Sequence, residues 1–175
     1  MSKALFEPAG RTERLLATLF LVLLATTAPA ASVDRDQPIN VRADHFEATQ
    51  REGLTILTGH VLITQGSLKA TADKATAHRD ANGDFNRIVM QGAPATLQQQ
   101  LDRGADMRGR ADSIDYAIND DIVTLTGHAH VERSDQGSFD GTRLVYNTVT
   151  GAIEGSGGDN GQVELVLKPR RNSNP

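Results

Sequence analysis

The sequence predicts an all-β protein, and three observations lead to that prediction. Apolar and polar residues alternate with period two along almost every segment after residue 30, which is typical of strands with one face turned inward. Turn-forming residues separate these segments. No segment of that region carries apolar residues at helical spacing over three turns. In addition, the nineteen residues 42–60 recur without a gap at 110–128 with seven identities, which indicates a repeated structural unit.

The first thirty residues predict a signal peptide that is cleaved on export. Basic residues precede a short apolar segment, 15–25, and Ala28-Pro29-Ala30 gives the small-residue pattern of a cleavage site. The apolar segment has about half of the ~20 residues that a membrane-spanning helix needs. Cleavage is therefore the favoured interpretation, and an uncleaved membrane anchor is the alternative.

Removal of 1–30 leaves one domain, 31–167, of ordinary size for a single hydrophobic core. The remaining tail, 168–175, has no apolar anchor and is expected to be disordered. The net charge of −4 argues against nucleic acid or an anionic membrane as the main partner. Because the chain has no cysteine, neither a disulfide framework nor thiol chemistry can contribute. A bacterial periplasm is the compartment that fits best.

Along the chain, the alternation predicts one strand after another. Apolar rows fall at 39–41, 57–63, 114–118, 125–131, 144–146 and 163–167. Turns are predicted at 50–53, 79–84, 119–121 and 148–151, with a loose loop at 155–161 before the last strand. Within the second of these turns, Asn82-Gly83 predicts a type I′ hairpin, which needs positive φ at both central residues.

A smaller unit recurs inside the large repeat, and each copy is expected to begin a strand. The copies start at Ala43, Ala72, Ala111 and Gly141, and each is interpreted as strand, turn, strand and a glycine-containing corner. Strand pairs of this kind stack into a solenoid-like roll or an elongated jelly roll. Such a roll has a continuous apolar interior and an unpaired strand edge at each end.

The candidate chemical residues indicate structure rather than catalysis. His128 and His130 would lie on one face of a strand, but a zinc site needs three or four ligands and no third ligand is implied, so no metal is expected. Asp44, Asp73 and Asp112 recur after alanine, and hydrogen bonding at corners is their favoured role. The sequence contains no nucleophile elbow and no phosphate-binding loop. We therefore expect no enzymatic activity and no cofactor.

Four stretches in this order closely resemble the OstA-like family of periplasmic lipopolysaccharide-transport proteins. They are "DQPINVRAD" at 36–44, "LTGHVLITQGSLKATADK" at 57–74, "GAPATLQQQ" at 92–100 and "SIDYAINDDIVTLTGHAHVE" at 113–132. The resemblance covers essentially the whole chain after the leader. One departure is His60 and His128, which stand where the family more often has asparagine.

The resemblance implies an open, slightly twisted β-jelly roll that carries lipopolysaccharide from the inner to the outer membrane and is not an enzyme. It also implies partners of similar fold, the inner-membrane transport protein C and the outer-membrane transport protein D, and end-to-end stacking that would permit head-to-tail homo-oligomers. One alternative is a membrane-anchored protein like transport protein C itself. An alternative of a different class is a β-solenoid enzyme that acts on polysaccharide.

An apolar trough open along one side could shelter the acyl chains of lipid A, since each CH₂ kept from water contributes ~0.8 kcal/mol. The alternation supplies lining candidates that could equally be plain core: Ile39, Val41, Leu57, Val61, Ile63, Leu97, Ile114, Tyr116, Ile118, Val131 and Phe139. At the two ends, a partner strand could be added by backbone hydrogen bonds. The candidate edge residues are Ile39, Asn40, Val41, Arg42, Val163, Leu165 and Leu167.

Overall fold

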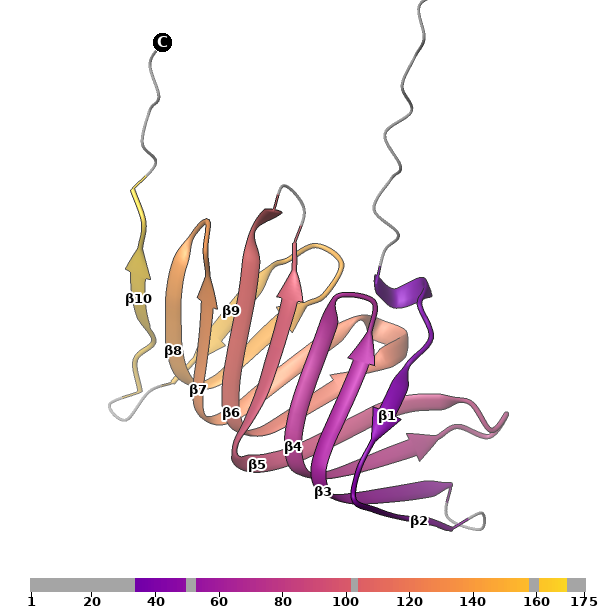
Figure 1. The fold of residues 1–175 in the computed structure, drawn as a ribbon. Coiled ribbons are helices and arrows are strands. Elements are labelled where there is room, and N and C mark those ends of the chain that lie inside the picture. The colour runs from indigo at the N-terminus through magenta and orange to yellow at the C-terminus, as the bar shows by residue number, and fades with distance from the viewer. Residues whose placement is uncertain (1–33, 50–52, 102–103, 158–160, 170–175) are drawn as a thin grey trace, which may run out of the picture. The chain divides into compact units, whose positions relative to one another are not determined.

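The computed structural model describes residues 34–49, 53–101, 104–157 and 161–169. In this part of the chain ten strands form one antiparallel sheet (Figure 1). No helix among the described residues is both long and apolar enough to cross a membrane. The all-β prediction is thereby confirmed, whereas the signal peptide lies outside the described residues and stays a prediction.

The strands follow one another along the chain and pair mostly with their sequence neighbours. They are β1 (Asn40–Arg42), β2 (His45–Thr49), β3 (Leu54–Gln65), β4 (Leu68–Arg79), β5 (Phe85–Gln100), β6 (Asp106–Ala117), β7 (Ile122–Arg133), β8 (Gly137–Asn147), β9 (Ile153–Ser156) and β10 (Glu164–Leu167). Two 3₁₀ turns, η1 (Asp34–Asp36) and η3 (Ile118–Asp120), complete the described elements. At one end of the sheet both β1 and β2 pair with β3, and at the other end both β9 and β10 pair with β8.

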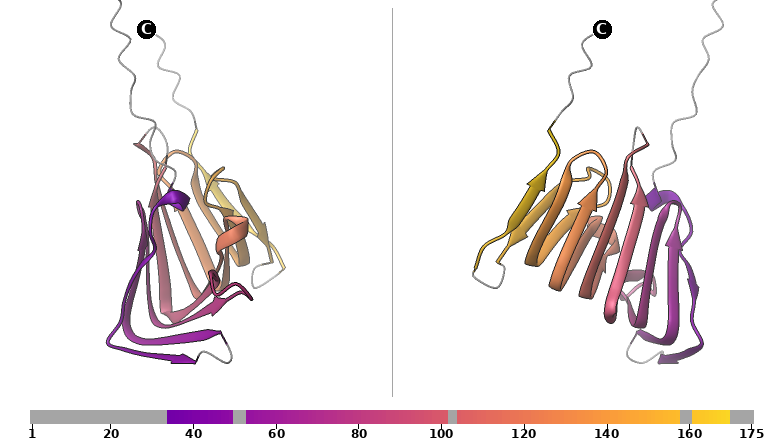
Figure 2. Two further views of the ribbon diagram at one scale, coloured as in Figure 1. Left: turned by 90° about the vertical axis from the view of Figure 1, so that its right-hand side faces the viewer. Right: turned by 60° about the vertical axis from the view of Figure 1, so that its left-hand side comes forward.

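Each long strand contributes to two walls, because the pairing register breaks near the middle of every ladder from β3 to β8. Wall A contains β1, β10 and the strand halves 61–65, 68–72, 95–100, 106–110, 129–133 and 137–141. Wall B contains β2, β9 and the halves 54–58, 74–79, 85–91, 113–117, 122–126 and 143–147. The left view of Figure 2 shows the walls diverging from a common line of bends.

The two copies of the long repeat build the same bend. Gly59 and Gly127 both have φ +76, and His60 and His128 also lie at positive φ. A Cβ on Gly59 would come within 2.4 Å of an Asp44 carboxylate oxygen, and one on Gly127 equally close to Asp112. A glycine is therefore required because the aspartate packs against the bend. The corner role predicted for these aspartates is confirmed for this pair.

The sequence predicts that each copy of the smaller recurring unit begins a strand, and this prediction is wrong. Ala72, Ala111 and Gly141 lie inside β4, β6 and β8, and only Ala43 falls between two strands. At a β-bulge the alternation of inward and outward side chains is interrupted. In the sequence that interruption looks the same as the start of a new strand.

The turn at Asp80–Asp84 is a hairpin, but it is not of type I′. Only Gly83, with φ +89, has a positive φ, and Asn82 does not. Instead the Asp80 carboxylate accepts hydrogen bonds from the backbone N–H groups of Asn82 (2.9 Å) and Asp84 (3.1 Å). The aspartate side chain thus supplies local bonds in a wider turn, which the dipeptide alone could not indicate.

Residues that pair in register from strand to strand form two rows that face the interior, one in each wall. In wall A one continuous row is Val41, Ile63, Ala70, Leu97, Gly109, Val131, Phe139 and Leu165. In wall B the corresponding row is Phe46, Leu57, Ala75, Met90, Ile114, Leu125, Leu144 and Gly155. A Cβ on Gly109 would come within 2.9 Å of Leu125, so the two walls are in contact across the middle.

Replacement of the bend glycine tests how tightly the repeat is built. Gly127→Ala should lower the free energy of unfolding by about 2–4 kcal/mol, since it adds overlap with Asp112 to a left-handed backbone. Gly83→Ala is the matched control, because Gly83 also has positive φ but nothing lies within 4 Å of its added Cβ. It should cost only about 1–2 kcal/mol. Urea unfolding followed by circular dichroism measures both, and equal losses would contradict the packing argument.

Candidate functional site

The predicted lining residues come together in the interior between the two walls. Leu57, Val61, Ile63, Leu97, Ile114, Tyr116 and Val131 are buried there. Ile39, Ile118 and Phe139 are partly buried against this cluster, and Val41 is 42% exposed at the β1 end. The alternation predicts that Ile118 lies in a strand, but it belongs to η3, where the backbone turns. Contact of these residues with lipid stays a prediction.

The side of the roll opposite the bends, here called the mouth, is closed by polar contacts between the walls. The Tyr116 hydroxyl donates to Gln65 Oε1 at 3.1 Å, and the Tyr146 hydroxyl donates to Gln99 Oε1 at 2.6 Å. Arg133 Nη1 donates to the Gly151 carbonyl at 2.5 Å. We call these three contacts the seam. In each contact, the last inward-facing side chain of a wall A strand bonds to the opposite wall. Gln65 and Gln99 bond to wall B strands, and Arg133 bonds to the turn after β8.

Burial makes the seam important for stability. Gln65, Gln99 and Arg133 are all less than 10% exposed. A buried polar group that loses its partner costs about 1–3 kcal/mol, so the walls cannot part here without other partners for these groups. Burial also raises the pKa of Tyr146, which keeps its hydroxyl protonated and able to donate.

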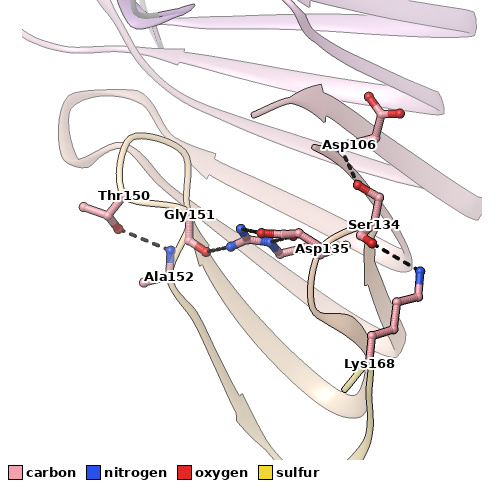
Figure 3. Close-up of polar contacts among 8 residues, drawn as sticks. Asp106, Ser134, Asp135, Thr150, Gly151, Ala152 and Lys168 are labelled. Carbon is pink, nitrogen blue, oxygen red and sulfur yellow. Dashed lines mark hydrogen bonds and ion pairs between the residues drawn. The ribbon is translucent and has the colours of Figure 1, made fainter. Parts of the chain in front are cut away.

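Arg133 has a second partner besides the carbonyl. Its Nε and Nη2 donate to the Asp135 carboxylate at 3.0 and 2.9 Å, and Figure 3 draws this contact together with the contact to the Gly151 carbonyl. This paired contact lowers the pKa of Asp135, because a hydrogen-bonded cation favours the ionised carboxylate. The arginine charge is therefore compensated at the point where the turns of both walls meet.

The N-terminal segment lies over the seam. Gln65 Nε2 donates to the Gln37 carbonyl at 3.2 Å, and Gln99 Nε2 donates to the Asp34 carboxylate at 2.8 Å. The same carboxylate accepts from the Ser67 backbone N–H at 2.7 Å and from the Ser67 hydroxyl at 2.6 Å. Each of the two seam glutamines thus forms hydrogen bonds both to a tyrosine of wall B and to the segment that precedes β1.

Sequence reasoning missed the seam, although a signal was present. Gln65 has the same parity as the apolar residues before it in β3, and Gln99 and Arg133 have that parity in β5 and β7. The apolar rows predicted from the sequence stop at Ile63 and Val131, one inward-facing position before Gln65 and Arg133. The partners across the mouth lie about fifty residues away or belong to turns, so the alternation could not pair them.

The two walls are shifted relative to each other along the sheet. Gln65 on β3 meets Tyr116 on β6, and Gln99 on β5 meets Tyr146 on β8. At the mouth, each of these wall A strands therefore faces the wall B strand three places further along the sheet order. Wall B consequently extends past wall A at the β2 end, where Phe46 is 69% exposed, and wall A extends past wall B at the β10 end, where Leu165 is 51% exposed.

The candidate edge residues fall at the two ends of the sheet. Asn40, Val41 and Arg42 form β1, with Ile39 directly before it, and Leu165 and Leu167 lie in β10. Val163 precedes β10 and is partly buried close to Gly155. Lys168, expected to open the disordered tail, donates from its backbone N–H to the Gln136 carbonyl at 2.8 Å. Residues 170–175 lie outside the described part of the chain, so the disordered tail remains a prediction there.

A polar surface pocket of about 480 Å³ lies at the tips of β4, β5 and η3. Its lining includes His78, Arg79, Asn86 and Arg87, and none of the predicted lipid-lining residues. Arg87 is paired with Asp115, and Arg79 packs over the Phe85 ring at 3.7 Å. The pocket is therefore distinct from the interior, and its arginines already have partners.

The histidines that suggested a metal site have separate carboxylate partners. His128 Nδ1 lies 2.9 Å from Asp112 at the bend, and His130 Nδ1 lies 2.6 Å from Asp140 on β8. His60 forms the equivalent contact with Asp44 at 2.6 Å. Among the described residues no group of three or more histidine or carboxylate side chains could hold a metal ion.

A family model described as "LptA/(LptD N-terminal domain) LPS transport protein" matches residues 40–152, which include all but the last two strands. The chain belongs to this family. Its curated relatives include the lipopolysaccharide export system protein LptA of Haemophilus influenzae, 29% identical over 90% of this chain and 92% of the relative. LptA of Escherichia coli is 30% identical over 91% of this chain and 88% of the relative.

A solved structure agrees with the fold. The crystal structure of LptH from Pseudomonas aeruginosa, described as the LptA-homologous periplasmic component of the lipopolysaccharide transport device, superposes with a TM-score of 0.72. It is 26% identical in sequence and covers 78% of this chain and 99% of the LptH chain. The predicted jelly roll of the family is confirmed, with a sheet that is open at its two terminal strands. The side that was expected to be an open trough is instead bridged by the seam. The prediction of a transport protein and not an enzyme is confirmed by the match to a family described as LPS transport proteins.

The bend contact at His60 should be visible as a pH dependence. Hydrogen bonding to Asp44 raises the pKa of His60, so the contact stabilises the fold fully below the ordinary histidine value of about 6.5 and is lost as the pH rises through the raised pKa. In an NMR titration, Asp44→Asn should lower the His60 midpoint towards 6.5. Asp112→Asn, which alters the equivalent bend, should leave it unchanged. An unchanged midpoint in Asp44→Asn would contradict this assignment.

Proposed function

We propose that this chain is a periplasmic carrier that shelters the acyl chains of lipopolysaccharide between its two walls on the way to the outer membrane. The observation that carries the proposal is the pair of apolar rows that run without interruption from β1 to β10 and from β2 to β9. The relatives named as lipopolysaccharide export proteins support it. Export by a cleaved signal peptide would deliver the chain to that compartment.

The ends of the roll offer acyl chains their first contacts. Val41 and Leu165 are exposed at opposite ends of the wall A row, and Phe46 is exposed at one end of the wall B row. A chain that covers these residues removes apolar surface on both molecules from water, at about 25 cal/mol per Å². Deeper entry requires the walls to part, because Ile114, Leu125 and Val131 are fully buried in contact with their neighbours.

Transfer between proteins then requires two interiors to be continuous. We propose that β1 and β10 add to the edge strands of other jelly rolls, namely transport protein C, transport protein D or a second copy of this chain. Each is the terminal strand of wall A in the sheet order, and each continues the wall A apolar row. An added strand in register would extend that row into the next molecule.

The interior assignment is tested by photo-crosslinking at adjacent positions of β8. Phe139 belongs to the inward row, whereas Ser138 points to the opposite face, and both are partly buried. A photo-reactive phenylalanine at position 139 should crosslink to lipopolysaccharide in cells, and the same residue at position 138 should not. Immunoblotting for lipopolysaccharide adducts gives the readout, and equal labelling at both positions would reject the interior as the lipid site.

The edge assignment is tested by proline at β10. Lys168 N–H bonds to Gln136 and antiparallel bonds alternate, so the N–H groups of Leu165 and Leu167 point to the unpaired edge. Leu165→Pro removes such a donor without removing a bond to β8. It should abolish self-association in sedimentation velocity and change the melting temperature little. Leu165→Ala, which keeps the donor, should weaken association less, and wild-type association of the proline variant would exclude this edge.

A further inference from the structure

The carboxylate of Asp34 is held in the way a bound anion would be held. Three donors converge on it: the Ser67 backbone N–H at 2.7 Å, the Ser67 hydroxyl at 2.6 Å and Gln99 Nε2 at 2.8 Å. Hydrogen bonds to an ionised acceptor are roughly twice as strong as those between neutral groups. We call Ser67, Gln99 and the adjacent Gly66 the anion cradle.

The cradle is shaped for a group with several oxygen atoms. Gly66 has φ +59, and a Cβ at this position would lie 2.2 Å from an Asp34 carboxylate oxygen. The glycine therefore serves both the tight turn between β3 and β4 and the close approach of the anion. Turns that combine glycine with a free backbone N–H are common binding elements for phosphate and carboxylate groups.

The cradle lies at the mouth, directly beside the seam. Gln99, which donates to Asp34 with its amide nitrogen, accepts the Tyr146 hydroxyl with its amide oxygen. Ser67 lies in the turn between β3 and β4, at the outer end of wall A. A lipid whose acyl chains lie between the walls would have its polar headgroup at this position.

Asp34, which occupies the cradle, is held there by contacts that can break without disturbing the strand pairing. Asp34 belongs to the three-residue turn η1, and β1, the next element, pairs separately with β3. The turn is held to the walls by the Asp34 carboxylate and by the Gln37 carbonyl, which accepts from Gln65. Release of Asp34 would therefore break side-chain contacts at the mouth and leave the strand ladders intact.

We propose that the anion cradle is a binding site for a phosphate or carboxylate group of the lipid headgroup, and that Asp34 occupies this site until the lipid displaces it. The proposal rests on the lipid-carrier function proposed above. The three donors require no positively charged side chain, and a monoester phosphate carries about −1.5 to −2 charge at pH 7. Exchange of the carboxylate for such a group keeps both the sign of the charge and the hydrogen bonds.

The same exchange explains how the seam can open. Parting of the walls leaves Gln99 and Tyr146 without their present partners, and headgroup phosphates and sugar hydroxyls can replace them. A plain fatty acid brings acyl chains but too few polar groups to satisfy the seam. The site therefore favours amphiphiles with a large, anionic, hydroxyl-rich headgroup.

The test compares lipid A with dephosphorylated lipid A on the mature chain. Asp34→Ala vacates the cradle, and if Asp34 occupies it about 90% of the time, the affinity for lipid A should rise about tenfold. Asp36→Ala is the matched control, because Asp36 lies in the same turn and is exposed. Adding Ser67→Ala to Asp34→Ala should remove the gain for lipid A and leave binding of dephosphorylated lipid A unchanged.

The possible outcomes separate this proposal from the carrier function. If wild type binds lipid A but Asp34→Ala binds it no more tightly with an intact circular dichroism spectrum, the cradle assignment is overturned and the carrier function stands. If no variant binds lipid A, both fail. Inorganic phosphate is the remaining probe: if it shifts the Ser67 amide signal of Asp34→Ala while the loss of lipid phosphates has no effect on lipid binding, the site takes free phosphate and the headgroup assignment fails.

Discussion

The structure depends on one constraint: each long strand must bend at its middle while both of its halves stay paired with the neighbouring strands, one half in each wall. The Asp44 and Asp112 carboxylates, packed against Gly59 and Gly127, build that bend in two of the strand pairs. Because the bends line up, the apolar side chains of neighbouring strands fall into rows that run the full length of the sheet. A shift of one residue at a single bend would turn half a strand inside out.

The bends also determine what happens at the opposite side of the roll. Walls that diverge from a line must be joined again by side chains, and here the joining groups are polar, buried and paired. An apolar interior and a hydrogen-bonded mouth respond differently to a lipid. Acyl chains can replace apolar contacts with similar ones, whereas the mouth needs new polar partners. In the proposed carrier, the interior would thus accommodate the chains and the mouth would select the headgroup.

Much of the fold could be predicted from the sequence, since alternation and repetition record the inward face of each strand directly. Seven of the lining candidates, including Val61 and Ile114, are indeed buried between the walls. The strand starts assigned to Ala72 and Ala111 were wrong, because a bulge and a strand start interrupt the alternation alike. The seam and the anion cradle were missed because Gln99 and Asp34 are sixty-five positions apart in the chain. Only the folded backbone brings them together.

The shift between the walls gives the molecule two unlike ends. One end presents part of wall B, with Phe46 uncovered, and the other presents part of wall A, with Leu165 uncovered. Two identical ends brought face to face would place the same wall of each molecule in contact. Two unlike ends would instead place the uncovered part of wall A of one molecule against the uncovered part of wall B of the next. A head-to-tail row of the kind proposed above would consequently have an inherent polarity, with every member oriented the same way.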